Sequence, residues 1–309
     1  MILTVTLNTA LDLTYRVRSL RPHTTHRVSA VAERPGGKGV NVARVLAALG
    51  HEVTVTGFAG GGTGRELRER LAGTPGVVDA LVPIAGATRR TIAVVDESTG
   101  DTTQLNEPGP QVTAAEWSAF QEAYATLLGP ASAVALCGSL PPGVPVGAYA
   151  GLIRAARSAG VPVLLDTSGE PLRRGVAARP DIAKPNAEEL AELTGFHEPL
   201  RAAREARRRG AHAVVASLGP DGLLAHTREG HWQVTPPSAV HGNPAGAGDS
   251  AVAGLLSGLV ERLTWPDRLA RAVALSAATV AAPVAGEFDR ATYEELRTQV
   301  AVTGEAGAA

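Results

Sequence analysis

The stretch SAVALCGSLPPGVPVGAYAGLIRAARSAGVPVLLDT, residues 132–167, decides the fold class. Its two ends, residues 132–138 and 161–167, are short apolar runs that predict buried strands. Between them, residues 147–160 show an alanine-, leucine- and arginine-rich helical pattern that ends in glycine, as helix C-termini often do. A strand, a helix and a second strand in this order predict two parallel strands joined by a crossover helix.

The same alternation continues along the rest of the chain. Short apolar runs predict further buried strands at residues 2–7, 52–58, 181–185 and 212–219. Helical patterns predict further helices at residues 40–50, 64–73, 113–129, 186–195, 204–210, 251–263 and 267–284. This order predicts an α/β protein with a mostly parallel sheet that helices cover on both faces.

Two stretches interrupt this alternation. Residues 12–34 and 88–106 alternate polar and apolar residues, and residues 98–100, Ser-Thr-Gly, have the composition of a hairpin turn. Because such strands cannot extend a buried parallel sheet, we expect a small antiparallel sheet that projects from the core. That sheet could cover an active site or form a dimer interface.

The bulk composition limits the class of protein. The chain has 309 residues, 44% hydrophobic and 19% charged, which predicts one large α/β domain or two smaller ones. A formal net charge of -1 gives no electrostatic reason to expect nucleic acid or an anionic membrane as partner. No run approaches the roughly 20 apolar residues of a membrane-spanning helix.

Cysteine usage and the N-terminal run bear on the compartment. The single cysteine, Cys137, excludes an internal disulfide framework and a cysteine-based zinc cluster, and it fits a reducing cytoplasm. The N-terminal run has no basic residue before it and carries Asp12, which favours a strand over a signal peptide. We therefore expect a cytoplasmic protein.

A glycine-rich turn, residues 246–248 (Gly-Ala-Gly), stands directly before Asp249 and an apolar helical run. The N–H groups at a helix start attract anions, usually phosphate, and glycine lets the backbone come close to them. Asp249 could cap the helix or act as a general base beside a bound phosphoryl group, and the segment alone favours the cap.

A second glycine-rich segment, PGGKGVNVAR at residues 35–44, precedes the first long helix. It contains Gly37, Asn41 and Lys38, one of only two lysines in the chain. The alternatives are a ligand site and a structural turn with a solvated lysine, and the scarcity of lysine favours the ligand site. The spacing does not match the phosphate loop of P-loop enzymes.

Other candidates follow later strands, because ligands of open α/β sheets bind beyond the carboxyl ends of the strands. A rigid proline- and glycine-rich loop presents Ser139. Asn186 and Glu189, three residues apart after Lys184, share one helix face and could cap a helix or hold metal-bound water. Residues 217–222 could bind a second phosphate or form a hairpin turn.

These motifs occur together in one order: TLNTALDLTY, PGGKGVNVARVLAALG, TTQLNEPGP, GSLPPGVP, DTSGEPL, KPNAEEL, SLGPDG and AGAGDSAVAG. They span roughly residues 3–286, and their combination resembles the ribokinase-like, or phosphofructokinase B type, carbohydrate kinases. Within these the chain is most similar to the 1-phosphofructokinase and tagatose-6-phosphate kinase branch. The resemblance implies a Rossmann-like three-layer α/β core with a small β-sheet lid, formed as one kinase domain over residues 1–309. It also implies ATP-dependent phosphorylation of a sugar hydroxyl, with Mg²⁺ as the expected cation.

The resemblance also implies roles for single residues. Asp249 becomes the general base, and Gly246, Ala247 and Gly248 become the anion hole for the transferred phosphate. The resemblance also implies which residues bind each ligand: the sugar (Asp12, Gly37, Asn41), a sugar phosphate (Lys38, Arg89, Ser139), the nucleotide (Lys184, Asn186, Ser217, Gly219, Gly222, Gly286) and magnesium (Glu189, through water).

The chain departs from the branch mostly on the sugar side. Residues 88–91 read TRRT where Thr-Arg-x-Asn is common, and residues 137–139 read Cys-Gly-Ser where Ser-Gly-Ser is usual. Residues 244–245, Pro-Ala, replace polar or β-branched residues before the anion hole. These changes bear on the substrate more than on the reaction.

Charge favours an acceptor that already carries a phosphate, of the fructose 1-phosphate or tagatose 6-phosphate type. Lys38, Arg89 and Arg90 supply cations that a neutral sugar does not need. The alternatives are a kinase of free hexoses or a nucleoside, and a non-catalytic sugar- or nucleotide-binding protein. An NAD-dependent dehydrogenase is disfavoured, because no G-x-G-x-x-G follows the first strand. Besides its small-molecule substrates, we expect no nucleic-acid or membrane partner, and a homodimer through the lid is the candidate assembly.

Overall fold

The computed structural model describes residues 1–236, 240, 242, 244–282 and 287–306. Its centre is an eleven-stranded sheet in the order β15-β14-β13-β12-β11-β10-β9-β1-β4-β5, with β6 also paired to β4. Strands β1 to β12 of this sheet pair in parallel, which confirms the predicted mostly parallel sheet. The strands are β1 (Ile2–Thr6), β4 (Val53–Gly60), β5 (Val77–Asp79), β6 (Val82–Ile84), β9 (Ala133–Cys137), β10 (Val163–Asp166), β11 (Ile182–Ala183), β12 (Ala213–Ser217), β13 (Leu223–His226), β14 (Gly230–Thr235) and β15 (Ala301–Ala306).

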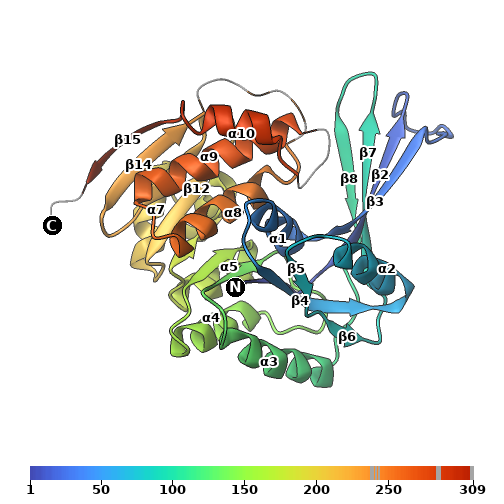
Figure 1. The fold of residues 1–309 in the computed structure, drawn as a ribbon, viewed down its shortest axis with the longest axis horizontal. Helices are drawn as coiled ribbons and strands as arrows, with labels where there is room; N and C mark the ends of the chain where they lie inside the picture. Colours follow the sequence, from blue (N-terminus) through green and yellow to red (C-terminus); the bar gives the residue numbers. More distant parts are fainter. Residues whose placement is uncertain (237–239, 241, 243, 283–286, 307–309) are drawn as a thin grey trace.

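Helices cover both faces of this sheet and make it the middle of three layers (Figure 1). One apolar core joins it to α1 (Lys38–Ala48), α2 (Gly61–Ala72), α8 (Ala247–Val260), α9 (Trp265–Ala281) and α10 (Arg290–Leu296). The other core joins it to α3 (Ala114–Leu128), α4 (Ala148–Ser158), α5 (Gly169–Ala177), α6 (Ala187–Thr194) and α7 (Pro199–Arg208). The strands that pack between these cores, such as β1 and β9, are buried at every position, and this explains their unbroken apolar runs.

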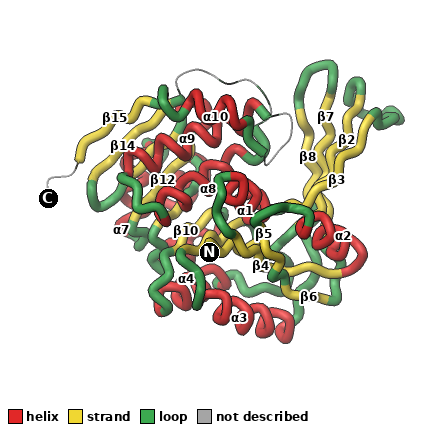
Figure 2. The backbone as a smooth tube through the Cα atoms, in the orientation of Figure 1, coloured by secondary structure: helices red, strands yellow, loops and turns green. Residues whose placement is uncertain are grey.

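A second sheet of four strands, in the order β3-β2-β7-β8, projects from the core (Figures 1 and 2). We call it the lid sheet; it consists of β2 (Ala10–Val17), β3 (Ala30–Gly36), β7 (Arg89–Asp96) and β8 (Thr102–Asn106). The predicted hairpin turn at residues 98–100 joins β7 to β8. The expectation of a wholly antiparallel sheet is wrong, because the central pair, β2 and β7, is parallel. Each insertion forms its own antiparallel hairpin, and the two hairpins leave the core side by side in the same direction.

The sequence prediction also missed one edge of the central sheet. Strands β13, β14 and β15 extend it in antiparallel fashion beyond β12, and β15 lies in what reads as an alanine- and glycine-rich tail. Short strands with mixed polarity carry little periodic signal, so their pairing depends on the tertiary structure. Among the described helices, none is long and apolar enough to span a membrane.

Candidate active site

A cavity of about 600 Å³ lies where the carboxyl ends of β1, β9, β10, β11 and β12 face the lid sheet. This is the edge at which open α/β sheets bind ligands. The N-termini of α1, α5, α6 and α8 also contribute residues to its lining, so four helix starts face one cavity. Most residues with a predicted role line it: Asp12, Gly37, Lys38, Asn41, Arg89, Ser139, Lys184, Asn186, Glu189, Ser217, Gly246, Gly248 and Asp249.

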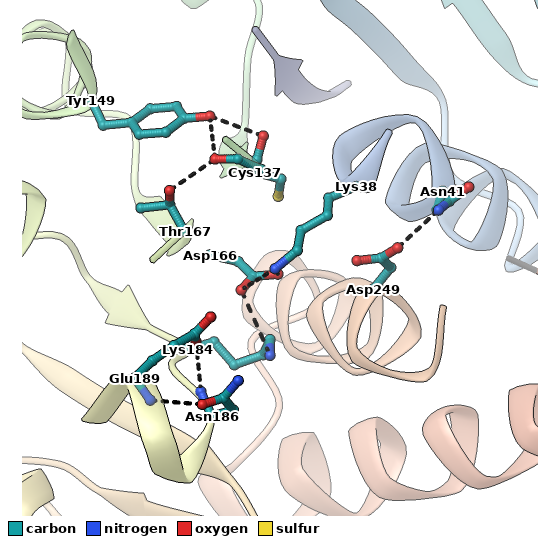
Figure 3. A network of polar contacts seen from close by, with 11 residues as sticks. Lys38, Asn41, Cys137, Tyr149, Asp166, Thr167, Lys184, Asn186, Glu189 and Asp249 are labelled. Atoms are coloured by element: carbon teal, nitrogen blue, oxygen red, sulfur yellow. Dashed lines mark hydrogen bonds and ion pairs between the residues drawn. The ribbon is translucent and has the colours of Figure 1, made fainter. Parts of the chain in front are cut away.

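Asp249 is the third residue of α8, whose N-cap is Gly246 in the left-handed conformation with φ 86°. The capping alternative for Asp249 is therefore wrong. Its carboxylate instead accepts a hydrogen bond of 2.9 Å from Asn41 Nδ2 on α1, across the cavity (Figure 3). This contact brings the two glycine-rich segments of the sequence together at one carboxylate.

Burial raises the pKa of Asp249 from 3.8 to about 6. The negative charge of Asp166 raises it too, whereas the ammonium groups of Lys38 and Lys184 and the hydrogen bond from Asn41 lower it. A carboxylate in this range is ionised at neutral pH and accepts a proton more readily than an ordinary aspartate, as a general base requires.

The two lysines of the chain meet at Asp166, the last residue of β10 (Figure 3). Lys38 Nζ lies 3.3 Å from both carboxylate oxygens, and Lys184 Nζ lies 3.8 Å from one of them. The Asp166 side chain is only 2% exposed, so its anion is held between cations with little access to water. Burial lowers the pKa of the Lys38 ammonium group, but the carboxylates of Asp166, Asp249 and Glu189 raise it further than burial lowers it.

The start of α8 lies close to this cluster. A Cβ atom on Gly248 would lie 3.8 Å from Lys184 Nζ, which places that ammonium group beside the first turn of the helix. Ala247 is the first residue of the helix. Backbone N–H groups and a buried ammonium group therefore converge on one side of Asp249, in an arrangement suited to a phosphoryl group.

One side of the cavity is built from lid residues. Asp12 on β2 accepts a short hydrogen bond from the Thr91 hydroxyl on β7. Burial raises the pKa of Asp12, although Thr91 and the charge of Arg89 oppose that rise. Arg89 donates to the backbone oxygens of Asn8 (3.3 Å) and Glu107 (3.0 Å). Its guanidinium group is thus fixed by neutral carbonyls at the cavity edge.

Glycine is required at Gly37 for two reasons. Its φ of 103° lies in the region that other residues avoid, and a Cβ there would lie 2.7 Å from Thr6 Cγ2. Gly37 is also the N-cap of α1, so its conformation sets the direction in which Lys38 and Asn41 leave the helix start.

Asn186 and Glu189 form a reciprocal cap of α6. Asn186 Oδ1 accepts from the Glu189 N–H at 2.8 Å, and Glu189 Oε2 accepts from the Asn186 N–H at 2.9 Å. The helix-cap alternative for this pair is confirmed. Glu189 nevertheless lines the cavity and acts electrostatically on Lys38, so its carboxylate faces the charged cluster.

The remaining predicted residues lie elsewhere. Gly219 begins η1 (Gly219–Asp221) and Gly222 follows it, in the turn between the antiparallel strands β12 and β13. Residues 217–222 therefore form the hairpin turn that was the alternative. Of that segment, only Ser217 is among the described residues that line the cavity. Gly286 lies outside the described residues.

Sequence reasoning missed several lining residues. Asp166 ends β10, Thr167 and Ser168 follow it, and Gln104 and Asn106 reach the cavity from β8. Asp166 could have been found, since the expected strand 161–167 places an aspartate at its carboxyl end inside the DTSGEPL motif. The two β8 residues lie in the TTQLNEPGP motif, but nothing in the strand pattern placed them at the cavity, because the lid pairing brings them there.

Comparison with known proteins agrees with this geometry. The family model of the pfkB family carbohydrate kinases matches residues 3–290. Escherichia coli phosphofructokinase-2 is similar to this chain at 31% identity over 96% of this chain and 98% of that one. Its TM-score is 0.91 for the potassium complex, 0.90 for the fructose-6-phosphate complex and 0.89 for a tetrameric inhibited form. A Thermotoga maritima protein described as a possible 1-phosphofructokinase has 28% identity, 99% coverage of both chains and a TM-score of 0.87. The chain therefore belongs to the pfkB family and is an ATP-dependent carbohydrate kinase with the ribokinase-like fold.

Proposed function

We propose that the chain, folded as one kinase domain, transfers the γ-phosphate of ATP to a hydroxyl group of a phosphorylated ketohexose. The observation that carries the proposal is the Asp249 carboxylate, held by Asn41 beside the N-terminus of α8. In this mechanism Asp249 takes the proton of the acceptor hydroxyl, whose oxygen then attacks the γ-phosphorus atom while ADP leaves. The N–H groups at residues 246–248 and the ammonium group of Lys184 stabilise the charge on the transferred group.

The carboxylate of Glu189, on the side of the cavity assigned to the nucleotide, suits Mg²⁺. Mg²⁺ prefers oxygen ligands and keeps several of its waters, and a carboxylate that accepts one capping bond can still accept others. Glu189 would hold it through water, and the cation would neutralise charge on the ATP phosphates. Among the described residues, no three His, Cys, Asp or Glu side chains form a metal cluster, so direct ligation by protein alone is not part of the proposal.

Arg89 supports a phosphorylated acceptor. It lines the cavity next to Asp12, and its guanidinium group contacts backbone carbonyls through the bonds described above. The neighbouring Arg90 is exposed and is not among the described residues that line the cavity, so the proposal assigns the acceptor phosphate to Arg89. Arg89 and Ser139 would bind the phosphate of the acceptor, with Lys38 as a third contact.

The test is a screen of phosphoryl acceptors with fructose 1-phosphate, fructose 6-phosphate, tagatose 6-phosphate and the free ketohexoses. Asp249→Asn should lower turnover by about 10²–10⁴-fold while nucleotide binding persists. Arg89→Ala should penalise the phosphorylated acceptors selectively, by around 2–4 kcal/mol in kcat/KM. Near-normal turnover in Asp249→Asn would remove the base role. A wild type that prefers the free ketohexoses would replace the proposed acceptor with a free hexose.

We also propose that two copies associate through the lid sheet. Val28, Val31 and Leu105 are 41%, 57% and 56% exposed, and all three lie on or next to lid strands. Large exposed apolar side chains on a projecting sheet favour a partner of the same kind. Val31→Glu should shift the protein from dimer to monomer in light-scattering chromatography, and an unchanged mass would exclude this interface.

A further inference from the structure

The carbonyl oxygen of Gly138, a residue that lines the cavity, is held by the hydroxyl groups of Thr167 and Tyr149 (Figure 3). Thr167 Oγ1 donates to it at 2.8 Å from the loop after β10, and Tyr149 Oη donates at 3.0 Å from α4. A carbonyl oxygen has two lone pairs, so it can accept from both hydroxyl groups, and Tyr149 shares its single proton between this oxygen and that of Cys137. The peptide group that joins Gly138 to Ser139 is therefore fixed from two separate elements.

The other atoms of Gly138 are fixed as well. Its N–H donates to the backbone oxygen of Asp166 at 2.9 Å, and its φ is 92°. A Cβ at this position would meet nothing closer than Lys38 Cβ at 3.8 Å, so glycine is needed here for its conformation and not for space. The chain thus turns at Gly138 in one defined geometry.

This turn presents Ser139. Its hydroxyl oxygen accepts a hydrogen bond of 3.1 Å from Asn8 Nδ2 and lines the cavity on the acceptor side. Ser139 follows directly after the braced carbonyl, so a rotation of the 138–139 peptide group would swing the hydroxyl away from Asn8. The direction of the Ser139 hydroxyl therefore depends on the Gly138 carbonyl.

Tyr149 is fully buried in an apolar core, where a phenylalanine ring would pack equally well. Burying a hydroxyl group costs free energy unless it is hydrogen-bonded. The Tyr149 hydroxyl lies 3.0 Å from the backbone oxygens of both Cys137 and Gly138, at the end of β9 where the site loop begins. Its hydroxyl group thus contacts the loop, while its ring packs in the core.

We propose that Tyr149 and Thr167 are positioning residues for the sugar acceptor, which act by holding the Gly138 carbonyl so that Ser139 faces the bound sugar phosphate. The inference rests on the proposed function, since it takes Ser139 to contact the acceptor. It assigns no role in the chemical step to either hydroxyl. Their loss should therefore affect acceptor binding and leave ATP binding unchanged.

The test compares Tyr149→Phe and Thr167→Val with the wild type, using whichever of the three sugar phosphates in the screen gives the highest kcat/KM. Each variant should raise KM for the acceptor by roughly 3- to 10-fold, the loss of one hydrogen bond, with KM for ATP changed less than twofold. Tyr124→Phe is the matched control: Tyr124 is buried in the same core and donates to the Leu152 oxygen at 3.2 Å, away from the cavity. It should change stability similarly and leave both KM values unchanged.

A double-mutant cycle separates this inference from the proposed function. If Tyr149 acts through Ser139, Tyr149→Phe should add less than twofold to acceptor KM in a Ser139→Ala background. Full additivity, or equal effects of Tyr149→Phe and Tyr124→Phe, would overturn the positioning role. If Ser139→Ala alone leaves KM unchanged for every sugar phosphate, the proposed acceptor position is wrong and the inference fails with it. If Ser139→Ala raises KM but Tyr149→Phe does not, only the inference fails.

Discussion

The buried carboxylate of Asp249 should lower the free energy of unfolding of the protein, and Asp249→Asn should raise it again. Its pKa of about 6 in the folded protein lies about two pH units above the ordinary value of 3.8. Each pH unit of such a difference corresponds to about 1.4 kcal/mol, so the ionised group destabilises the folded state by up to about 3 kcal/mol at neutral pH. Asp249→Asn removes that cost, while its amide oxygen can still accept the hydrogen bond from Asn41.

The direction in which stability changes with pH follows from proton binding. Between pH 3.8 and about 6, the folded state holds the Asp249 proton more tightly than the unfolded state, so stability falls as the pH rises through this range. The stability gained by Asp249→Asn should therefore be small at pH 4.5 and nearly complete at pH 7.5. The difference between the two gains should be about 2 kcal/mol.

The measurement is urea unfolding of wild type and Asp249→Asn at both pH values, with the free energy of unfolding taken from linear extrapolation. Glu122→Gln, at an exposed position on α3, is the control and should show no such difference. An equal effect of Asp249→Asn at both pH values would refute the reasoning, as would a variant less stable than wild type at pH 7.5. The expected result is a more stable protein with lower turnover, because the carboxylate of the proposed base is a buried charge that destabilises the fold.

Three further predictions concern the same site and its support. The kcat/KM of wild type should fall below an apparent pKa of about 6, and Lys38→Met should move this fall to higher pH, because the ammonium group lowers the pKa of Asp249. A pH–rate profile unchanged in Lys38→Met would contradict the coupling. Glu189→Gln should raise the Mg²⁺ concentration needed for half-maximal activity without abolishing ATP binding, and an unchanged metal titration would leave Glu189 as a helix cap alone. Gly254→Ala should lower the free energy of unfolding by about 1–3 kcal/mol, because its Cβ would lie 2.7 Å from Ala272 Cα where α8 packs on α9; a thermal melt equal to wild type would contradict this.

The strand and helix order, and most of the site, could be predicted from the sequence. Strands buried on both faces read as apolar runs because every side chain meets a core, and helix periodicity marks the layers that cover them. The site residues follow from the same pattern, since the carboxyl ends of parallel strands meet at one edge. Lys184, directly after such a strand, could therefore be expected at this edge without coordinates, and the family resemblance added Lys38 and Asp249.

Only the tertiary structure decided the pairings between segments that are distant in sequence. The parallel pairing of β2 with β7 sets Asp12 opposite Thr91, and nothing local to either hairpin encodes that register. The same holds for Asp166, whose buried carboxylate lies between two ammonium groups contributed by residues 128 and 18 positions away. Local periodicity reports which face of an element is buried, whereas charge placement and pKa depend on which neighbours the packing brings within a few ångströms. The resemblance of the sequence motifs therefore indicated the reaction class, but the electrostatic state of Asp249, the proposed base, could not be read from the sequence.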